Sequence, residues 1–368
     1  MSRTFPALTV LFALAACTTS PTPADGTPTE VPATPVVPPP TPVPQPMGCS
    51  GELVMGPNTA LGAIGLAEDG EIFVVGSPNH GNPWQLARFD RDAVELEPVV
   101  SFDASWVTES YIDVTADRVR IHEFYPTGGF IDWNRGTGEV TRDVGSPDDT
   151  FGPYAWAGST FSVVVGSQVG ECENLCFVRE SADGSTEILV DDGVAPFSIG
   201  GVLAYTGRWA YFGTYASTTS DEDFNTLRRL DLETGVVELV HAFAGSGAIQ
   251  HFTVGSDGTA HWVREEGGAA YFDAHDIGTG ETRWAVAESG PSGWVVDVVR
   301  AGDRVFWGDD EGVSSFGVAD GGVTRHHARV ADSNLLHFAV DAANVWFTET
   351  TYDPDTGAFA SSMGCYAL

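Results

Sequence analysis

Five polar residues stand beside or within short apolar segments that recur through the chain, and they are of types that bind metals or transfer protons. They are Glu109, Tyr111, His251, Asp297 and His337. Imidazole and carboxylate groups that converge on one axis bind a divalent metal or act as general acid and base. The alternative is that they are ordinary polar residues that line a water-filled channel. Both interpretations require a fold that brings these side chains together.

A second set of carboxylates lies in segments that are expected to be loops. Hard carboxylate oxygens on flexible loops are the ligands that Ca²⁺ prefers. Asp353 and Asp355, followed by Gly357, show part of a calcium-loop pattern without its complete set of ligand positions. The alternative is that these side chains are simply solvated, in which case the protein needs no cofactor. The first interpretation predicts Ca²⁺ or another divalent metal.

Motifs of several enzyme classes are missing from the sequence. It contains no G-x-S-x-G, no H-E-x-x-H, no phosphate-binding glycine loop and no dinucleotide fingerprint. Their absence disfavours the hydrolases, metalloproteases and nucleotide-binding proteins that depend on them.

One short pattern recurs seven times between residue 61 and the C-terminus, and it predicts the elements that position these residues. Its second positions are 47, 42, 49, 50, 45 and 40 residues apart, at Ile72, Val119, Phe161, Ala210, Ala260, Val305 and Val345. A unit of this size, made of short strands and tight turns, is typical of one β-propeller blade. The sequence therefore predicts an all-β fold, a seven-bladed β-propeller of four-stranded antiparallel blades.

Each unit holds four predicted strands, named A to D from the centre of the ring outwards. In the sixth unit we expect them near residues 294–300, 304–308, 313–318 and 323–330, joined by turns rich in Gly and Asp. The B strands are apolar at consecutive positions, which favours burial on both faces by neighbouring blades. Up-and-down strand order places the long D–A and B–C loops on one face. The five polar residues lie where the A strands enter at that face, so we predict the functional site there.

The two ends of the chain predict how the ring closes. The seventh unit has only three strands before Leu368, and residues 51–55 form a single strand before the first unit. We expect this N-terminal strand to complete the last blade as its outer strand.

Cys17 ends the apolar N-terminal segment, which is typical of exported proteins, and four further cysteines follow it. An even number of cysteines in an exported chain predicts two disulfides. The count alone leaves three pairings open. Closure by the N-terminal strand brings Cys49 beside Cys365 and leaves Cys172 to pair with Cys176. On the chain-entropy model, a disulfide contributes more to stability the longer the loop that it encloses, so this one would contribute strongly.

One propeller family is similar to this chain in its B-strand cores. The segment Ala339-Val-Asp-Ala-Ala-Asn-Val-Trp-Phe-Thr-Glu resembles the strand A–turn–strand B core of YWTD-type and related bacterial propeller repeats. Gly258-Thr-Ala-His-Trp-Val and Gly302-Asp-Arg-Val-Phe-Trp-Gly are looser copies. The resemblance covers all seven units only at the level of architecture. It implies a binding platform and assigns no reaction.

The N-terminus predicts where the protein resides. Residues 5–16 are mostly apolar, follow Arg3, and are too few for a permanent transmembrane helix. They end in Leu14-Ala15-Ala16-Cys17, which resembles the bacterial lipobox. The resemblance implies removal of a signal peptide (1–16) and lipidation of Cys17, with the bacterial outer membrane as the expected destination. The alternative is an ordinary secretory signal with a chance cysteine.

The segment that follows Cys17 is rich in proline. Residues 18–47 contain eleven prolines and no aromatic residue. Proline fixes φ and removes a backbone donor, so we expect an extended stalk with a reach of about 90 Å. The predicted organisation is a signal peptide (1–16), a lipidated Cys17 with its stalk (17–47) and a propeller domain (48–368).

The composition restricts the partners. The net charge is −34, and all 17 basic residues are arginine. Nucleic acids and anionic lipid surfaces would be repelled, so we expect no nucleic-acid partner and membrane contact only through the Cys17 lipid. We expect a monomer.

These observations favour a non-enzymatic lipoprotein that presents its propeller to a protein or glycan partner outside the cytoplasm. The alternative is an extracytoplasmic hydrolase or lyase that uses the histidines and carboxylates at the channel mouth, with or without a divalent metal. A third hypothesis is a subunit of a cell-envelope complex. The sequence names no ligand.

Overall fold

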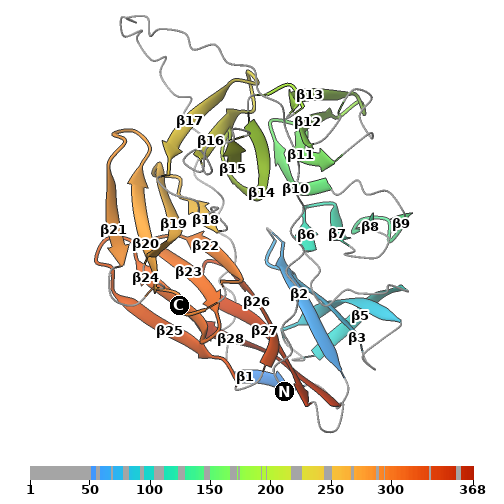
Figure 1. The fold of residues 1–368 in the computed structure, drawn as a ribbon. Coiled ribbons are helices and arrows are strands. Elements are labelled where there is room, and N and C mark those ends of the chain that lie inside the picture. Colours follow the sequence, from blue (N-terminus) through green and yellow to red (C-terminus); the bar gives the residue numbers. More distant parts are fainter. Residues whose placement is uncertain are drawn as a thin grey trace, which may run out of the picture.

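The structure is a computed structural model, and every regular element in its described residues is a β-strand. The strands form seven four-stranded antiparallel sheets, arranged as the blades of a propeller (Figure 1). In the part of the chain that the structure describes, no helix is long and apolar enough to cross a bilayer. The described residues are 51–54, 59–67, 69–77, 83–91, 95–102, 112–122, 129–144, 150–165, 172, 175–191, 193–195, 197–216, 226–243, 251–266, 269–286, 290–293, 295–330, 333–353 and 358–368.

The seven blades have the same strand order, A to D from the inside outwards. Strands A are β2 (Ala60–Leu66), β6 (Ile112–Val114), β10 (Thr150–Trp156), β14 (Phe197–Thr206), β18 (Phe252–Val254), β22 (Asp297–Ala301) and β26 (Ser333–Val340). Strands B are β3 (Ile72–Ser77), β7 (Arg118–His122), β11 (Ser159–Val165), β15 (Trp209–Ala216), β19 (Thr259–Glu266), β23 (Arg304–Asp309) and β27 (Asn344–Asp353). Strands C are β4 (Trp84–Asp90), β8 (Gly129–Asn134), β12 (Leu175–Ser181), β16 (Thr226–Asp231), β20 (Ala269–Asp276), β24 (Gly312–Gly317) and β28 (Ala358–Ala367). Strands D are β5 (Glu95–Phe102), β9 (Val140–Val144), β13 (Thr186–Asp191), β17 (Val237–Ala242), β21 (Thr282–Val286), β25 (Val323–Ala328) and β1 (Gly51–Val54).

The recurring apolar position of the B strands forms the core between the blades. All seven of its residues, from Ile72 to Val345, are at most 1% exposed. Adjacent residues of one B strand pack on opposite neighbours: Val305 lies in a cluster with Phe272 of blade five, and Phe306 in a cluster with Phe347 of blade seven. Burial on both faces explains why these strands are apolar at consecutive positions, as the sequence predicted.

The ring closes as predicted, through the N-terminal strand. β1 pairs with β28 and completes blade seven, with Gly51 opposite Cys365. Buried hydroxyl groups then join blade seven to blade one: Thr348 Oγ1 donates to the Gly62 carbonyl at 2.7 Å, and Ser361 Oγ donates to the Thr59 carbonyl at 2.6 Å. Cys365 is disulfide-bonded, and its predicted partner Cys49 lies outside the described residues. The Cys49–Cys365 pairing therefore stays a prediction.

The short C–D turns end strands C in a recurring way. The last residue of the strand is Asn134, Asp231 or Asp276, and its side-chain oxygen accepts the backbone N–H two residues later at 2.8 to 3.0 Å. The chain then turns at a glycine with positive φ, such as Gly138 at 73°. Such a φ is strained for other residues, so the recurring glycine is required by the backbone.

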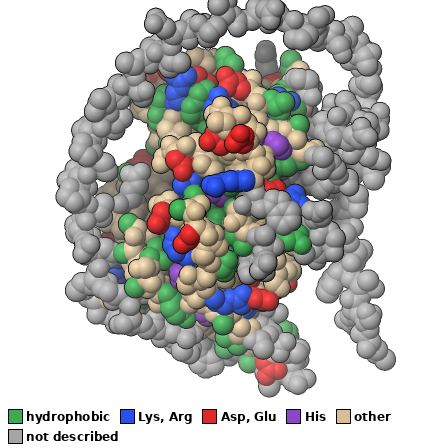
Figure 2. All heavy atoms as spheres, turned by 90° about the vertical axis from the view of Figure 1, so that its left-hand side faces the viewer, with side chains coloured by type: hydrophobic (Ala, Val, Ile, Leu, Met, Phe, Trp, Pro, Cys, Tyr) green, Lys and Arg blue, Asp and Glu red, His purple; other side chains and the backbone are tan. Residues whose placement is uncertain are grey.

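Ion pairs at the A–B turns connect adjacent blades. In three places an arginine reaches back to an aspartate in the A–B turn of the preceding blade. The pairs are Arg91–Asp341, Arg135–Asp69 and Arg300–Asp257. On the side of the molecule in Figure 2, arginine and acidic side chains are interspersed. Arg91, Arg135 and Arg300 are thus committed to ion pairs between blades.

Candidate functional site at the channel mouth

Three of the five predicted residues lie at the same level of three consecutive blades. The inner strands β18, β22 and β26 are neighbours around the centre (Figure 1). His251 directly precedes β18, and its carbonyl accepts the Val263 N–H at 3.3 Å. Asp297 and His337 occupy the matching places in the other two strands, opposite Gly308 and Thr348. Each of the three partners, Val263, Gly308 and Thr348, lies three positions after the buried core residue of its B strand. The register of strands A and B therefore places His251, Asp297 and His337 at the same level.

The exposure of these side chains differs from that of the residues that follow them. His251 and His337 are half-buried and Asp297 is exposed. The next residues, Phe252, Val298 and Phe338, are buried between the blades. The polar side chains therefore lie at the rim of the packed core, where a ligand can reach them.

Incomplete hydration shifts the pKa values of His251 and Asp297. Burial lowers the pKa of His251 to about 4, so its imidazole is neutral at physiological pH. Water reaches Asp297, but the surrounding blades displace much of its hydration and raise the pKa of its carboxyl. The Val298 N–H opposes this shift by donating to Asp297 Oδ1 at 2.7 Å. A neutral imidazole and a poorly hydrated carboxyl group are well suited to donate and accept hydrogen bonds from a ligand.

The three side chains do not form a ready-made metal centre. In the described parts of the chain, the only three metal-binding side chains with ligand atoms within 4.8 Å of one another are Cys172, Cys176 and Asp191. His251, Asp297 and His337 are therefore spread too widely to hold one ion as they stand. Their spacing fits a larger polar ligand that contacts several blades.

The other predicted site residues are placed only in part. Glu109 and Tyr111 lie outside the described residues. Asp353 is the exposed last residue of β27, and Asp355 lies outside the described residues. Calcium binding at this loop stays a prediction. Cys172 and Cys176 form the predicted disulfide in the B–C loop of blade three.

Two tyrosines on neighbouring inner strands were missed by the sequence argument. Tyr154 of β10 and Tyr205 of β14 stack with ring centroids 4.5 Å apart. The Tyr205 hydroxyl is buried without a hydrogen-bond partner among the described residues, and burial raises its pKa. Both tyrosines pair with the core position of their B strands, Phe161 and Ala210. This shared register was the signal that could have found them.

Comparison with known proteins finds other structures with a similar fold. No protein-family model matches the sequence, and no curated protein matches it either. Solved structures do match. The structure of oligogalacturonate lyase in complex with manganese is 10% identical, with a TM-score of 0.58, and the match covers 86% of this chain and 98% of that one. The likeness is one of fold alone.

Two further structures give the same result. The extracellular domain of a one-component system from B. thetaiotaomicron is 13% identical, with a TM-score of 0.55, covering 85% of this chain and 39% of that chain. A prolyl endopeptidase is 9% identical, with a TM-score of 0.52, covering 80% of this chain and 47% of that chain. A lyase, the extracellular domain of a one-component system and a prolyl endopeptidase share the architecture, so function must be argued from the site.

Proposed function

We propose that this protein is a lipid-anchored propeller that binds a partner outside the cytoplasm through its channel mouth. The observation that carries the proposal is the alignment of His251, Asp297 and His337 at one accessible level of three adjacent blades. The lipobox at Cys17 and the proline-rich stalk support the location, because together they would hold the domain away from a membrane.

The chemistry of the mouth favours a polar ligand larger than an ion. Neutral imidazole and a carboxyl group bind the hydroxyl groups of a glycan or the polar side chains of a protein. The net charge of −34 disfavours polyanions and favours neutral or cationic ligands. A protein or a neutral glycan is therefore the partner that fits best.

Site-directed photo-crosslinking in intact cells tests the binding face. A photoreactive amino acid at His251 or His337 should capture the partner. The same amino acid at Thr279, in a C–D turn on the opposite face, should capture far less. Equal capture at both places, or none at the mouth, would reject the channel mouth as the binding site.

The anchor has its own test. Cys17→Ser should move the protein from the membrane fraction to the soluble fraction and remove the acyl mass from its N-terminal peptide. Retention of Cys17→Ser in the membrane would mean that something other than the lipid holds it there.

A second candidate is an enzyme of the hydrolase or lyase class. The same three residues and the fold shared with a manganese-bound lyase favour it. The wide spacing would then require the side chains to move toward a metal. Turnover of a glycan panel that is lost in His251→Ala, together with a stoichiometric divalent ion, would support the enzyme over the binding protein.

A further inference from the structure

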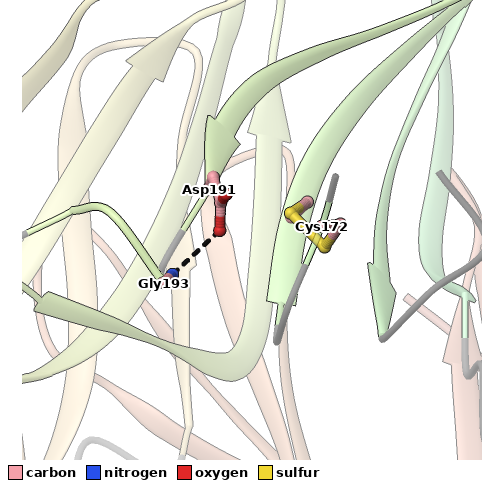
Figure 3. Close-up of a disulfide and its surroundings, with 4 residues drawn as sticks. Cys172, Asp191 and Gly193 are labelled. Carbon is pink, nitrogen blue, oxygen red and sulfur yellow. Dashed lines mark hydrogen bonds between the residues drawn. A yellow bond between two sulfur atoms is a disulfide. The ribbon is translucent and has the colours of Figure 1, made fainter. Parts of the chain in front are cut away.

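A second group of reactive side chains lies in blade three, away from the channel mouth. Cys176 of strand β12 is directly opposite Asp191 of strand β13, so their side chains lie on the same face of the sheet. Cys172 is joined to Cys176 by a disulfide, and Asp191 lies beside it (Figure 3). The two sulfur atoms and a carboxylate oxygen lie within 4.8 Å of one another.

The group is held in place by its surroundings. The Gly193 N–H donates to Asp191 Oδ1 at 2.8 Å, and this bond orients the carboxylate (Figure 3). The two cysteines are almost completely buried, and Ile188 packs against the cluster that they form with neighbouring valines. Oriented ligands inside an apolar shell are the features that support a metal site.

A surface groove lies along the outer edge of the same sheet. It has a volume of about 440 Å³ and lies between the outer strands of blades three and four. Asp191 lines it together with Ile188, Val194 and Val237. Asp191 is half-buried at the end of the edge strand β13, whereas the sulfur atoms lie with Val164 and Val178 on the face of the sheet opposite Val190 and Phe197. An ion would therefore reach the sulfur atoms around this edge, past the carboxylate.

We propose that reduction of this disulfide creates a binding site for Zn²⁺ or a similar thiophilic divalent cation. A dithiol reductant supplies two electrons and two protons. The S–S bond breaks, two thiols form, and the reductant becomes a disulfide. Binding of the cation to Cys172, Cys176 and Asp191 then releases the two thiol protons, because thiolates are the ligands. Disulfide and bound cation exclude each other, so the site is gated by redox state.

The geometry requires only small movements. Zinc binds thiolate sulfur at about 2.3 Å and carboxylate oxygen at about 2.0 to 2.2 Å in a tetrahedral arrangement, which places two sulfurs about 3.8 Å apart. Side-chain rotation of the freed cysteines supplies this opening. Three protein ligands leave the fourth position for water.

This inference does not depend on the proposed function. Cys172 lies in the B–C loop of blade three, and Cys176 and Asp191 lie in its strands C and D, whereas His251, Asp297 and His337 lie at the inner strands of blades five to seven. Failure of the crosslink at the channel mouth would leave the zinc proposal unchanged. Failure of zinc binding would likewise leave the proposed function unchanged.

Zinc titration of the full chain tests the proposal. The oxidised chain should take up no zinc in competition with a chromophoric chelator. The chain reduced with dithiothreitol and desalted without oxygen should bind one zinc per chain and release two protons. Cobalt should give a thiolate-to-metal charge-transfer band in the reduced chain only. Absence of zinc uptake after reduction, or equal uptake by the oxidised chain, would overturn the proposal.

Variants locate the ion. Asp191→Asn should weaken zinc binding at least about tenfold. Mutation of a residue that only hydrogen-bonds to a metal ligand already lowers metal affinity by about this factor, and Asp191 would be a ligand itself. The matched control is Asp183→Asn, an exposed aspartate that hydrogen-bonds Ser185 in the C–D turn of the same blade. Cys172→Ser should lose the cobalt band while its circular dichroism stays that of the wild type. Equal weakening by Asp183→Asn, or unchanged binding by Asp191→Asn, would place the ion elsewhere and contradict the assignment.

Discussion

Burial at the scale of single residues makes the stability of this protein depend on pH. His261 is 1% exposed between blades five and six. Burial lowers its pKa to about 4, and the nearby Arg300 acts in the same direction. The unfolded chain binds a proton near pH 6.5, so stability is complete above that pH and falls as the pH drops toward 4.

We expect His261→Gln to remove this part of the pH dependence. Between pH 7 and pH 5, burial of His261 should lower the free energy of unfolding of the wild type by about 2 kcal/mol. Glutamine does not titrate, so this part of the loss should be absent from the variant. Urea unfolding at the two pH values measures the difference. Thr279→Gln, an exposed turn variant, should behave as the wild type. Equal losses in wild type and His261→Gln would mean that the folded protein protonates this histidine normally.

The site residues show what a single sequence reveals at this scale. His251, Asp297 and His337 could be predicted because titratable residues stand out beside apolar strands. Tyr205 and Asp191 were missed. A tyrosine in a strand is most often an ordinary packing residue, so Tyr205 did not stand out. The position of Asp191 beside the disulfide depends only on its cross-strand register with Cys176.

At the scale of elements, the A–B turns do more than reverse the chain. Asp257 accepts the Thr259 N–H at 3.0 Å within its own turn, and it accepts two hydrogen bonds from Arg300 of the next blade, at 2.7 and 2.9 Å. The arginine side chain is largely buried, whereas the aspartate is half-exposed. The turn therefore joins blades five and six, which are also held by a hydrogen bond from the Arg300 N–H to Thr253 Oγ1 at 3.1 Å and by apolar packing.

Asp257→Asn should separate these two roles. The amide oxygen can still cap the turn, but the charge that pairs with Arg300 is lost, so we expect a loss of about 1 kcal/mol. Chemical denaturation at low and high salt measures it, and the loss should shrink at high salt. Asp183 lies in a turn, and its carboxylate hydrogen-bonds only to Ser185 among the described residues. Asp183→Asn should therefore change stability little. Similar losses in both variants would assign the effect to the lost charge of a turn aspartate and not to the pair with Arg300.

At the scale of the whole molecule, stability depends on closure of the ring. β1 is a short strand, yet it covers the edge of β28 and joins the two ends of the chain. A version that lacks residues 1–57 should leave this edge open, unfold at lower denaturant concentration and aggregate. A version that lacks only residues 1–46 keeps β1 and should match the full chain. Equal midpoints for the two truncations would show that β1 is dispensable.

The disulfides give a covalent test of the same closure. Peptide mapping without reductant should recover Cys172 joined to Cys176 and Cys49 joined to Cys365. Cys365→Ser should then cost roughly 5 to 6 kcal/mol on the chain-entropy model, because the unfolded chain loses its longest loop constraint. Recovery of Cys365 joined to any other cysteine would contradict the predicted pairing.

The sequence by itself determined the number of blades, the B-strand core and the way the ring closes. The blades and their cores repeat, and each depends on local patterns of apolar residues, glycine and aspartate within one unit. Closure follows from counting strands, because the last unit lacks the one strand that the N-terminus supplies. Only the tertiary structure decided which side chains share a level of the channel, that His251, Asp297 and His337 are too far apart for one ion, and that Asp191 lies beside a disulfide. Those relations depend on register between strands and on contacts between blades, which chain spacing does not encode.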